Sequence, residues 1–220
     1  MRKVKFQNDS YYHIYNRGVD KREIFCNEKD YLRFLISIRE FNNIDSVESI
    51  YRLNQMRRKV ETKFLRFEPN RRNLVSIICY CLNPNHFHLL IKQLSENGVQ
   101  AFMHKLGLGY TNYFNNRYAR GGSLFQGTYQ AVEVKSSGQL EYVSAYINGN
   151  AEIHGIAKAQ NYKWCSYPDY LGKRKGTLCN KREIFQYFNN SIGEYKEFVK
   201  EIIINSKQIK KEIKEILLEV

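Results

Sequence analysis

Two apolar segments that stand almost next to each other place the strongest constraint on the fold of this chain. Residues 74–82 read LVSIICYCL and are apolar on both alternating faces, which is typical of a central strand covered on each side. The turn residues Asn83, Pro84 and Asn85 separate this segment from residues 86–91, HFHLLI, which predict a second strand. The two segments therefore predict a hairpin in the middle of a sheet.

The patterns on both sides of this hairpin predict further strands and helices. In chain order we expect a strand over 11–17, a helix from about 27, the two hairpin strands, a helix over about 99–114, a strand over 128–135 and a helix over about 139–150. This strand-helix-strand-strand-helix-strand order is that of ferredoxin-like and RNA-recognition-like domains. We therefore expect an α+β fold with helices packed on an antiparallel sheet.

The chain is expected to divide into two parts. Residues 1–171 would form the sheet domain, with a basic insertion at about 43–72. Residues 172–220 would form a basic linker and a C-terminal helical extension, whose isoleucines lie along one stripe.

Charge and composition limit the functional classes. The 220 residues include 35 Lys and Arg against 22 Asp and Glu, a net charge of +13. Such an excess favours a polyanionic partner, first nucleic acid and second an anionic membrane surface. Aromatic residues make up 14%, enough for a packed core, which excludes a disordered chain. No segment approaches the roughly 18 apolar residues of a membrane span, and no signal peptide is recognisable, so we expect a cytoplasmic, nucleoid-associated protein.

The cysteines predict no metal site. Their number, five, is odd, and they include no C-x-x-C pair, so we expect reduced thiols. Cys79 and Cys81 stand two apart in the apolar strand, where a buried pair of small hydrophobic side chains is the expected arrangement.

A pair of histidines on the second hairpin strand is the first candidate for chemistry. His86 and His88 are separated by one residue, so both imidazoles project from the same face of a strand. Two neutral imidazoles placed in this way can bind one divalent cation. A surface pair without a ligand is the alternative, because the H-x-H pattern often arises by chance.

The helix expected from residue 139 supplies a candidate nucleophile. Tyr142, Tyr146 and Asn150 recur every four residues and share one flank of this helix. Tyr146 has a hydroxyl that can attack phosphorus, and Asn150 has an amide oxygen that can bind the same cation. The alternative is an aromatic residue at the edge of the core and an asparagine near the helix end. Tyr142 and Tyr113 are fallback nucleophiles.

Several segments, taken in order, resemble the REP-associated tyrosine transposase family within the IS200-like single-tyrosine transposases of the HUH class. Together they span about residues 10–171. The matching segments are YHIYNRG at 12–18, NPNHFHLL at 83–90, GSLFQG at 122–127, YINGN at 146–150 and WCSY at 164–167.

The resemblance implies a site and a reaction. His86 and His88 would hold a divalent metal ion, Tyr146 would be the nucleophile, and Asn150 would complete the metal site. Two departures stand out: Asn150 is followed by Ala151 where the family usually has proline, and Thr128 stands where arginine is common. The absence of proline after Asn150 affects where the helix ends. Thr128 in place of arginine affects a contact with a DNA phosphate.

The implied chemistry suits these residue types. A phenol has a pKa near 10, so tyrosine is a poor nucleophile at neutral pH unless the phosphate is made more electrophilic. A bound Mg²⁺ or Mn²⁺ would do so as a Lewis acid. Attack by Tyr146 would give a 5′-phosphotyrosine and a free 3′ hydroxyl, so rejoining needs no nucleotide cofactor.

Single-stranded or hairpin DNA is the expected partner, because the resembled family recognises palindromic repeats that fold back. A non-cleaving hairpin-binding protein and an RNA-recognition-like module are the alternatives, and a homodimer stays open. His13, His104 and His154 are interpreted as structural or surface groups. The candidate phosphate contacts, for which a solvated charged face is the alternative, are Arg17, Arg57, Arg58, Lys59, Arg71, Arg72, Lys173, Arg174 and Lys175.

Overall fold

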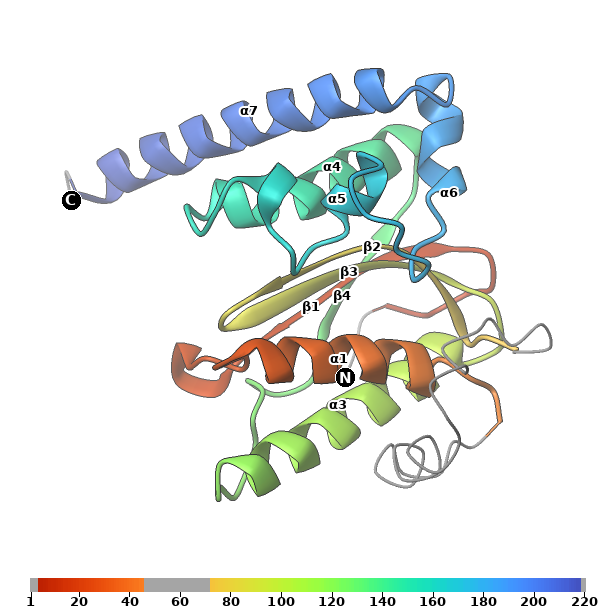
Figure 1. Cartoon of the computed structure of the whole chain (residues 1–220), viewed down its shortest axis with the longest axis vertical. Coiled ribbons are helices and arrows are strands. Elements are labelled where there is room, and N and C mark those ends of the chain that lie inside the picture. The colour runs from red at the N-terminus through yellow and green to blue at the C-terminus, as the bar shows by residue number, and fades with distance from the viewer. Residues whose placement is uncertain (1–3, 46–71, 219–220) are drawn as a thin grey trace.

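A four-stranded antiparallel sheet forms the centre of the molecule (Figure 1). The computed structural model describes residues 4–45 and 72–218. The strands lie in the order β2-β3-β1-β4, with each pair antiparallel. Their bounds are Tyr11–Arg17 for β1, Val75–Asn83 for β2, His86–Gln93 for β3 and Gln130–Val134 for β4. The predicted antiparallel α+β fold and the β2-β3 hairpin are confirmed. The predicted central position of residues 74–82 is wrong, because β2 lies at the edge of the sheet. Its side chains are still buried on both faces, and backbone hydrogen bonds with Trp164, Ser166 and Asn180 cover its outer edge.

Helices α1 (Glu28–Phe41) and α3 (Gly98–Arg117) cover one face of the sheet, which we call the lower face (Figure 1). Asn27 and Asp30 form a capping box that begins α1 where the sequence predicted it. In α3, a Cβ on Gly109 would lie 2.5 Å from the ring of Phe41, so this glycine lets the two helices approach closely. The face is otherwise closed by buried aromatic and aliphatic side chains.

The opposite, upper face carries α4 (Ser137–Ile153) and, above it, the long α7 (Ile192–Leu218) (Figure 1). Two short helices, α5 (Tyr167–Tyr170) and α6 (Arg182–Phe185), lie between them in the chain. Single 3-10 turns occur at Val19–Lys21, Ala159–Asn161 and Gln186–Phe188. A second apolar cluster joins α4 and α7 to β2.

Strand alternation decides which side chains reach each face. Tyr12 and Ile14 of β1 lie in the lower core, whereas Tyr11 packs against the upper one. Cys79 and Cys81 are free thiols that are fully buried in the upper core, as the sequence predicted.

Two outcomes concern the predicted boundaries. The helix predicted to end at about residue 150 continues to Ile153, because the chain has alanine rather than proline after Asn150. The two-part division at residue 171 stays a prediction, as does the insertion at 43–72, most of which lies outside the described residues. Within the described part of the chain, no helix is both long and apolar enough to cross a membrane.

Candidate active site

The two histidines of the H-x-H pattern lie on the upper face, at the start of β3. Their ring centroids are 5.2 Å apart, and His88 is only 8% exposed. Phe87, between them, points into the lower core. The predicted projection of both imidazoles from one face is therefore confirmed.

Helix α4 brings Tyr146 over these histidines. The ring of Tyr146 stands almost perpendicular to that of His88, at 87° and a centroid separation of 6.1 Å. Tyr142, one turn earlier, is 47% exposed and stacks on Tyr146 with its ring tilted by only 14°. Tyr146 thus lies between a buried imidazole and an exposed aromatic ring.

Asn150 lies one turn after Tyr146 and is fully buried. Its Oδ1 accepts a hydrogen bond of 2.5 Å from Nδ2 of Asn83, the last residue of β2. The same Asn83 nitrogen lies 2.8 Å from Nε2 of His86. Asn83 therefore connects Asn150 to His86, so that α4 and the β2-β3 turn meet at one point.

The hydrogen bonds define the protonation of His86. Its Nδ1 lies 2.6 Å from Oδ1 of Asn85, and because an amide oxygen only accepts, Nδ1 carries the proton. Nε2 then has a free lone pair, which accepts from Asn83. Asn85 and Asn83, both in the turn that the sequence identified, thus fix the ring of His86 with the Nε2 lone pair directed at Nδ2 of Asn83.

Burial keeps this site uncharged. It lowers the pKa of His86 to about 4, with smaller contributions from the positive charges of neighbouring groups, and it holds the pKa of His88 well below 6.5. Burial also raises the pKa of the Tyr146 phenol, an effect partly offset by the neighbouring amide of Asn150. At neutral pH the imidazoles are therefore neutral and Tyr146 is protonated.

The residues present fit the divalent metal that the resemblance implies. No group of three or more His, Cys, Asp or Glu side chains suited to a metal occurs in residues 4–45 and 72–218. A site here accordingly needs the amide oxygen of Asn150 beside His86 and His88. Nδ2 of Asn150 is buried without a hydrogen-bond partner in the described structure, but this N–H group is a donor and cannot itself bind a cation, so the fit rests on the amide oxygen and the two imidazoles. Neutral imidazoles with an amide oxygen suit Mn²⁺ or Mg²⁺ with added waters.

Sequence reasoning missed three residues that border the site. His13, interpreted as structural or surface, has Nε2 at 2.9 Å from Nδ1 of His88. His154, at the C-cap of α4, has its ring 5.2 Å from that of His86. Asn83 received no individual role. His13 alternates with Tyr11 and Tyr15 along β1, but only the pairing of β1 with β3 shows that it reaches the histidine pair.

The predicted phosphate contacts do not gather in one place. Arg17 is exposed at the end of β1 and faces the site, whereas Arg72 is exposed and forms an ion pair of 2.9 Å with Asp45. Lys173 and Lys175 are exposed beyond α5. Four further candidates lie outside the described residues: Arg57, Arg58, Lys59 and Arg71.

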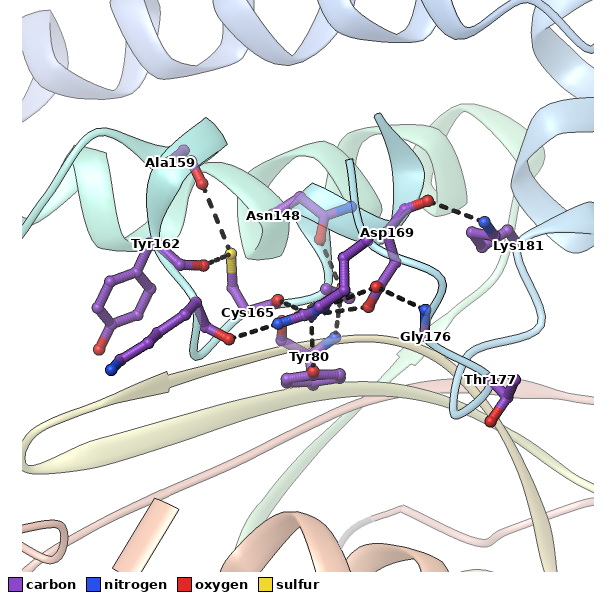
Figure 2. A network of polar contacts seen from close by, with 12 residues as sticks. Tyr80, Asn148, Ala159, Tyr162, Cys165, Asp169, Gly176, Thr177 and Lys181 are labelled. Carbon is purple, nitrogen blue, oxygen red and sulfur yellow. Dashed lines mark hydrogen bonds and ion pairs between the residues drawn. The ribbon is translucent and has the colours of Figure 1, made fainter. Parts of the chain in front are cut away.

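Arg174 instead belongs to an internal polar network with Tyr80, Cys165 and Asp169, which are labelled in Figure 2. Its guanidinium makes two bonds of 2.7 Å to the carboxylate of Asp169 and donates to the backbone oxygens of Lys163 and Cys165. Asp169 is 3% exposed and also accepts from the backbone of Gly176. These contacts give Arg174 a structural role, since its donors are directed into the protein.

The same network anchors the helix that carries Tyr146. Oγ of Ser166 bonds with the backbone nitrogen of Tyr80 in β2 at 2.9 Å and donates to Oδ1 of Asn148 in α4 at 2.7 Å (Figure 2). Asn148 stands two residues after Tyr146. The segment WCSY at 164–167 therefore connects the sheet to α4 and fixes the height of that helix above β2.

Comparisons with known proteins found one family model and a similar solved structure. The sequence model of the family described as "Transposase IS200 like" matches residues 49–150, which include His86, His88, Tyr146 and Asn150. A solved structure of a REP-associated tyrosine transposase bound to a REP hairpin aligns with a TM-score of 0.49 and 9% identity, over 81% of this chain and 88% of that chain. Among curated proteins, none matches this chain.

Proposed function

We propose that this chain, whose resemblance to the IS200-like transposases is confirmed over residues 49–150, is a metal-dependent strand transferase that acts on single-stranded DNA at hairpin-forming sequences. One observation carries the proposal. Tyr146 and Asn150 on α4 meet His86 and His88 on β3, although these pairs are separated by about 60 residues in the sequence.

The proposed reaction is a transesterification. The Tyr146 oxygen attacks a backbone phosphorus and loses its proton, a Tyr-O-P bond forms, and the bond to the 3′ oxygen breaks. The leaving 3′ oxygen takes up a proton and becomes a hydroxyl. Because one phosphodiester replaces another, a second 3′ hydroxyl can reverse the step and rejoin the DNA. A divalent metal bound by His86, His88 and Asn150 would supply Lewis acidity toward the phosphate.

The surrounding residues prepare the site for this step. Neutral His86 presents the Nε2 lone pair, and Asn85 holds the proton on Nδ1. In one tautomer of His88, Nδ1 carries the proton and donates it in a hydrogen bond to Nε2 of His13. Nε2 of His88 is then free to bind a metal. The neighbouring amide of Asn150 opposes the increase in the pKa of Tyr146 that burial causes. Each of these contacts positions a group or its proton before DNA binds.

A hairpin-binding protein that does not cleave is the second candidate, and one contact favours it. Nδ2 of Asn83 already donates to both His86 and Asn150, so the two acceptor atoms are satisfied by the protein itself. An RNA-recognition-like module has less support. Such modules stack bases on an open sheet, whereas α4 packs on β2 and β3 here.

A cleavage assay separates these functions. Labelled single-stranded hairpin oligonucleotides are incubated with the protein and Mn²⁺, or with a chelator, and analysed by denaturing electrophoresis. The proposal predicts cleavage that is lost in chelator and in the Tyr146→Phe variant, and retained in the matched Tyr142→Phe variant. Tight hairpin binding without cleavage in Mn²⁺ would instead support the non-cleaving function. Cleavage by Tyr146→Phe would remove Tyr146 from its role.

A further inference from the structure

The C-terminal helix α7 runs along α4 in the same direction, on the side away from the sheet (Figure 1). Near the start of α7, the hydroxyl of Tyr195 accepts a bond of 2.8 Å from Asn148 of α4 and lies 3.2 Å from Oγ of Ser144. Tyr195 is fully buried. These bonds, together with the packed apolar cluster, make the α4-α7 contact a fixed part of the fold.

A glycine on α4 fixes the register of the two helices. A Cβ at Gly149 would lie 2.6 Å from Cγ1 of Ile203, so Ile203 occupies the space that any side chain at 149 would need. Gly149 stands between Asn148, which binds Tyr195, and the candidate ligand Asn150. The register of α7 is therefore defined next to the candidate active site.

This register carries two lysines of α7 to the C-terminal end of α4. Lys207 forms an ion pair of 3.3 Å with Glu152. One turn on, Nζ of Lys210 lies 3.1 Å from Nε2 and 3.2 Å from Nδ1 of His154. Since the His154 ring stands 5.2 Å from that of His86, Lys210 lies beside the candidate metal site although it is 60 residues further along the chain than Asn150.

Arg17 adds a second positive charge to this corner. Arg17 is the direct partner of His86 in the pairing of β1 with β3, which brings it beside the histidine pair. The charges of Arg17 and Lys210 both lower the pKa of His86 and that of His154. No ion pair joins Arg17 or Lys210 to a carboxylate among the described side chains, and the nearby Glu152 is engaged by Lys158 and Lys207. Two elements, β1 and α7, thus bring positive charge to the site, and no carboxylate among the described side chains forms an ion pair with either charge.

We propose that Arg17, His154 and Lys210 form a subsite for a backbone phosphate of the DNA strand, next to the phosphate that Tyr146 attacks. The proposal rests on the function proposed above and gives α7 a direct part in it. Arg17 from β1 and Lys210 from α7 would hold the phosphate from two sides. Neutral His154 contacts Lys210 and would keep its ammonium group directed at the phosphate. The subsite takes a phosphodiester rather than a base, because its groups are charged donors without an aromatic platform.

Salt-dependent DNA binding tests the subsite without requiring cleavage. In a Tyr146→Phe background, the affinity for a fluorescent single-stranded oligonucleotide is measured by anisotropy at several salt concentrations. Lys210→Ala is expected to weaken binding and to reduce the salt slope by about 0.7, the value for one phosphate contact on single-stranded DNA. Lys210→Arg should retain the slope. Lys200→Ala, an exposed lysine on the same helix, is the matched control and should leave both quantities unchanged.

Neutral methylphosphonate linkages, placed one at a time along a cleavable oligonucleotide, locate the contact. At one position next to the attacked phosphate, the neutral linkage should weaken binding by the protein that has Lys210. It should weaken binding less in Lys210→Ala, where only Arg17 still contacts that phosphate. If every position weakens both proteins equally, or if Lys210→Ala behaves like Lys200→Ala, the subsite is refuted. Absence of cleavage by the wild type would overturn the proposed function alone, because an oligonucleotide that is bound but not cleaved still reports the salt slope.

Discussion

The amide nitrogen of Asn83 lies 2.5 Å from the amide oxygen of Asn150, and this contact ties the end of β2 to the helix that carries Tyr146. Both side chains are fully buried. Because the same nitrogen also donates to His86, one residue outside the implied ligand set holds two of its members in place. The position of Asn150 relative to His86 is therefore a property of the protein before any metal binds.

Replacing Asn83 should loosen the candidate metal site. Asn83→Ala leaves two buried acceptors without a donor, at a cost of about 1–3 kcal/mol in the free energy of unfolding. Removing a residue that orients ligands typically lowers metal affinity about 10–100-fold. Mn²⁺ titration by calorimetry measures this loss, with Asn180→Ala, on an exposed residue, as the control. Unchanged Mn²⁺ affinity in a folded Asn83→Ala protein would show that Asn83 does not organise the site.

Acid should destabilise the fold before its carboxylates are protonated. Burial lowers the pKa of His13 and of His86 to about 4, whereas an unfolded histidine titrates near 6.5. Between these values the unfolded chain binds more protons, so stability is present above pH 6.5 and is lost as the pH falls toward 4. Each histidine then contributes at most about 2 kcal/mol between pH 7 and 5. Urea unfolding at pH 7 and pH 5 measures this loss of stability. In His13→Gln, the difference in the free energy of unfolding between the two pH values should be smaller. Equal stability of the unmodified protein at both pH values would contradict buried neutral imidazoles.

The contact between α4 and α7 gives a third prediction. Gly149→Ala forces the new methyl group against Ile203, and we expect a loss of about 1–3 kcal/mol in the free energy of unfolding. Ile203→Ala removes Cγ1, the atom that the new methyl group would meet, and should recover part of this loss in the double variant. Chemical denaturation of the single and double variants measures the coupling. Additive effects would mean that the two residues do not meet.

Arg174 provides a contrast between structural and DNA-binding basic residues. Arg174→Ala leaves Asp169 buried without its partner, so we expect a loss of about 3–5 kcal/mol in stability. The salt slope of DNA binding by the folded fraction should not change, because the guanidinium is already engaged inside the protein. A reduced slope at unchanged stability would restore Arg174 as a phosphate contact.

The sequence was sufficient to predict the sheet, because its signals are local. The apolar segment at 74–82, the turn at Asn83-Pro84-Asn85 and the alternation of His86 and His88 all act within a few residues. They predicted the hairpin, its face and the helix that follows. The antiparallel order β2-β3-β1-β4 then agrees with the predicted order of elements.

The residues that the sequence did not reveal depend on contacts over long separations. His13 meets His88 across 75 residues, and Lys210 meets His154 across 56. Neither pair has a spacing that a periodic pattern can detect. Arg174 was grouped with phosphate contacts because its neighbours are basic, yet the carboxylate that engages it, Asp169, is only five residues away and buried. Local charge therefore predicted a basic surface but could not distinguish which arginine faces inward.

Identification of the covalently modified residue tests the central claim most directly. The protein is trapped with Mn²⁺ and a hairpin oligonucleotide, denatured, digested with nuclease and protease, and analysed by mass spectrometry. The account predicts that a nucleotide remnant is attached through its 5′ phosphate to Tyr146, and that chelator abolishes it. A remnant on Tyr142 or Tyr113, or cleavage without any protein-linked nucleotide, would contradict Tyr146 as the nucleophile.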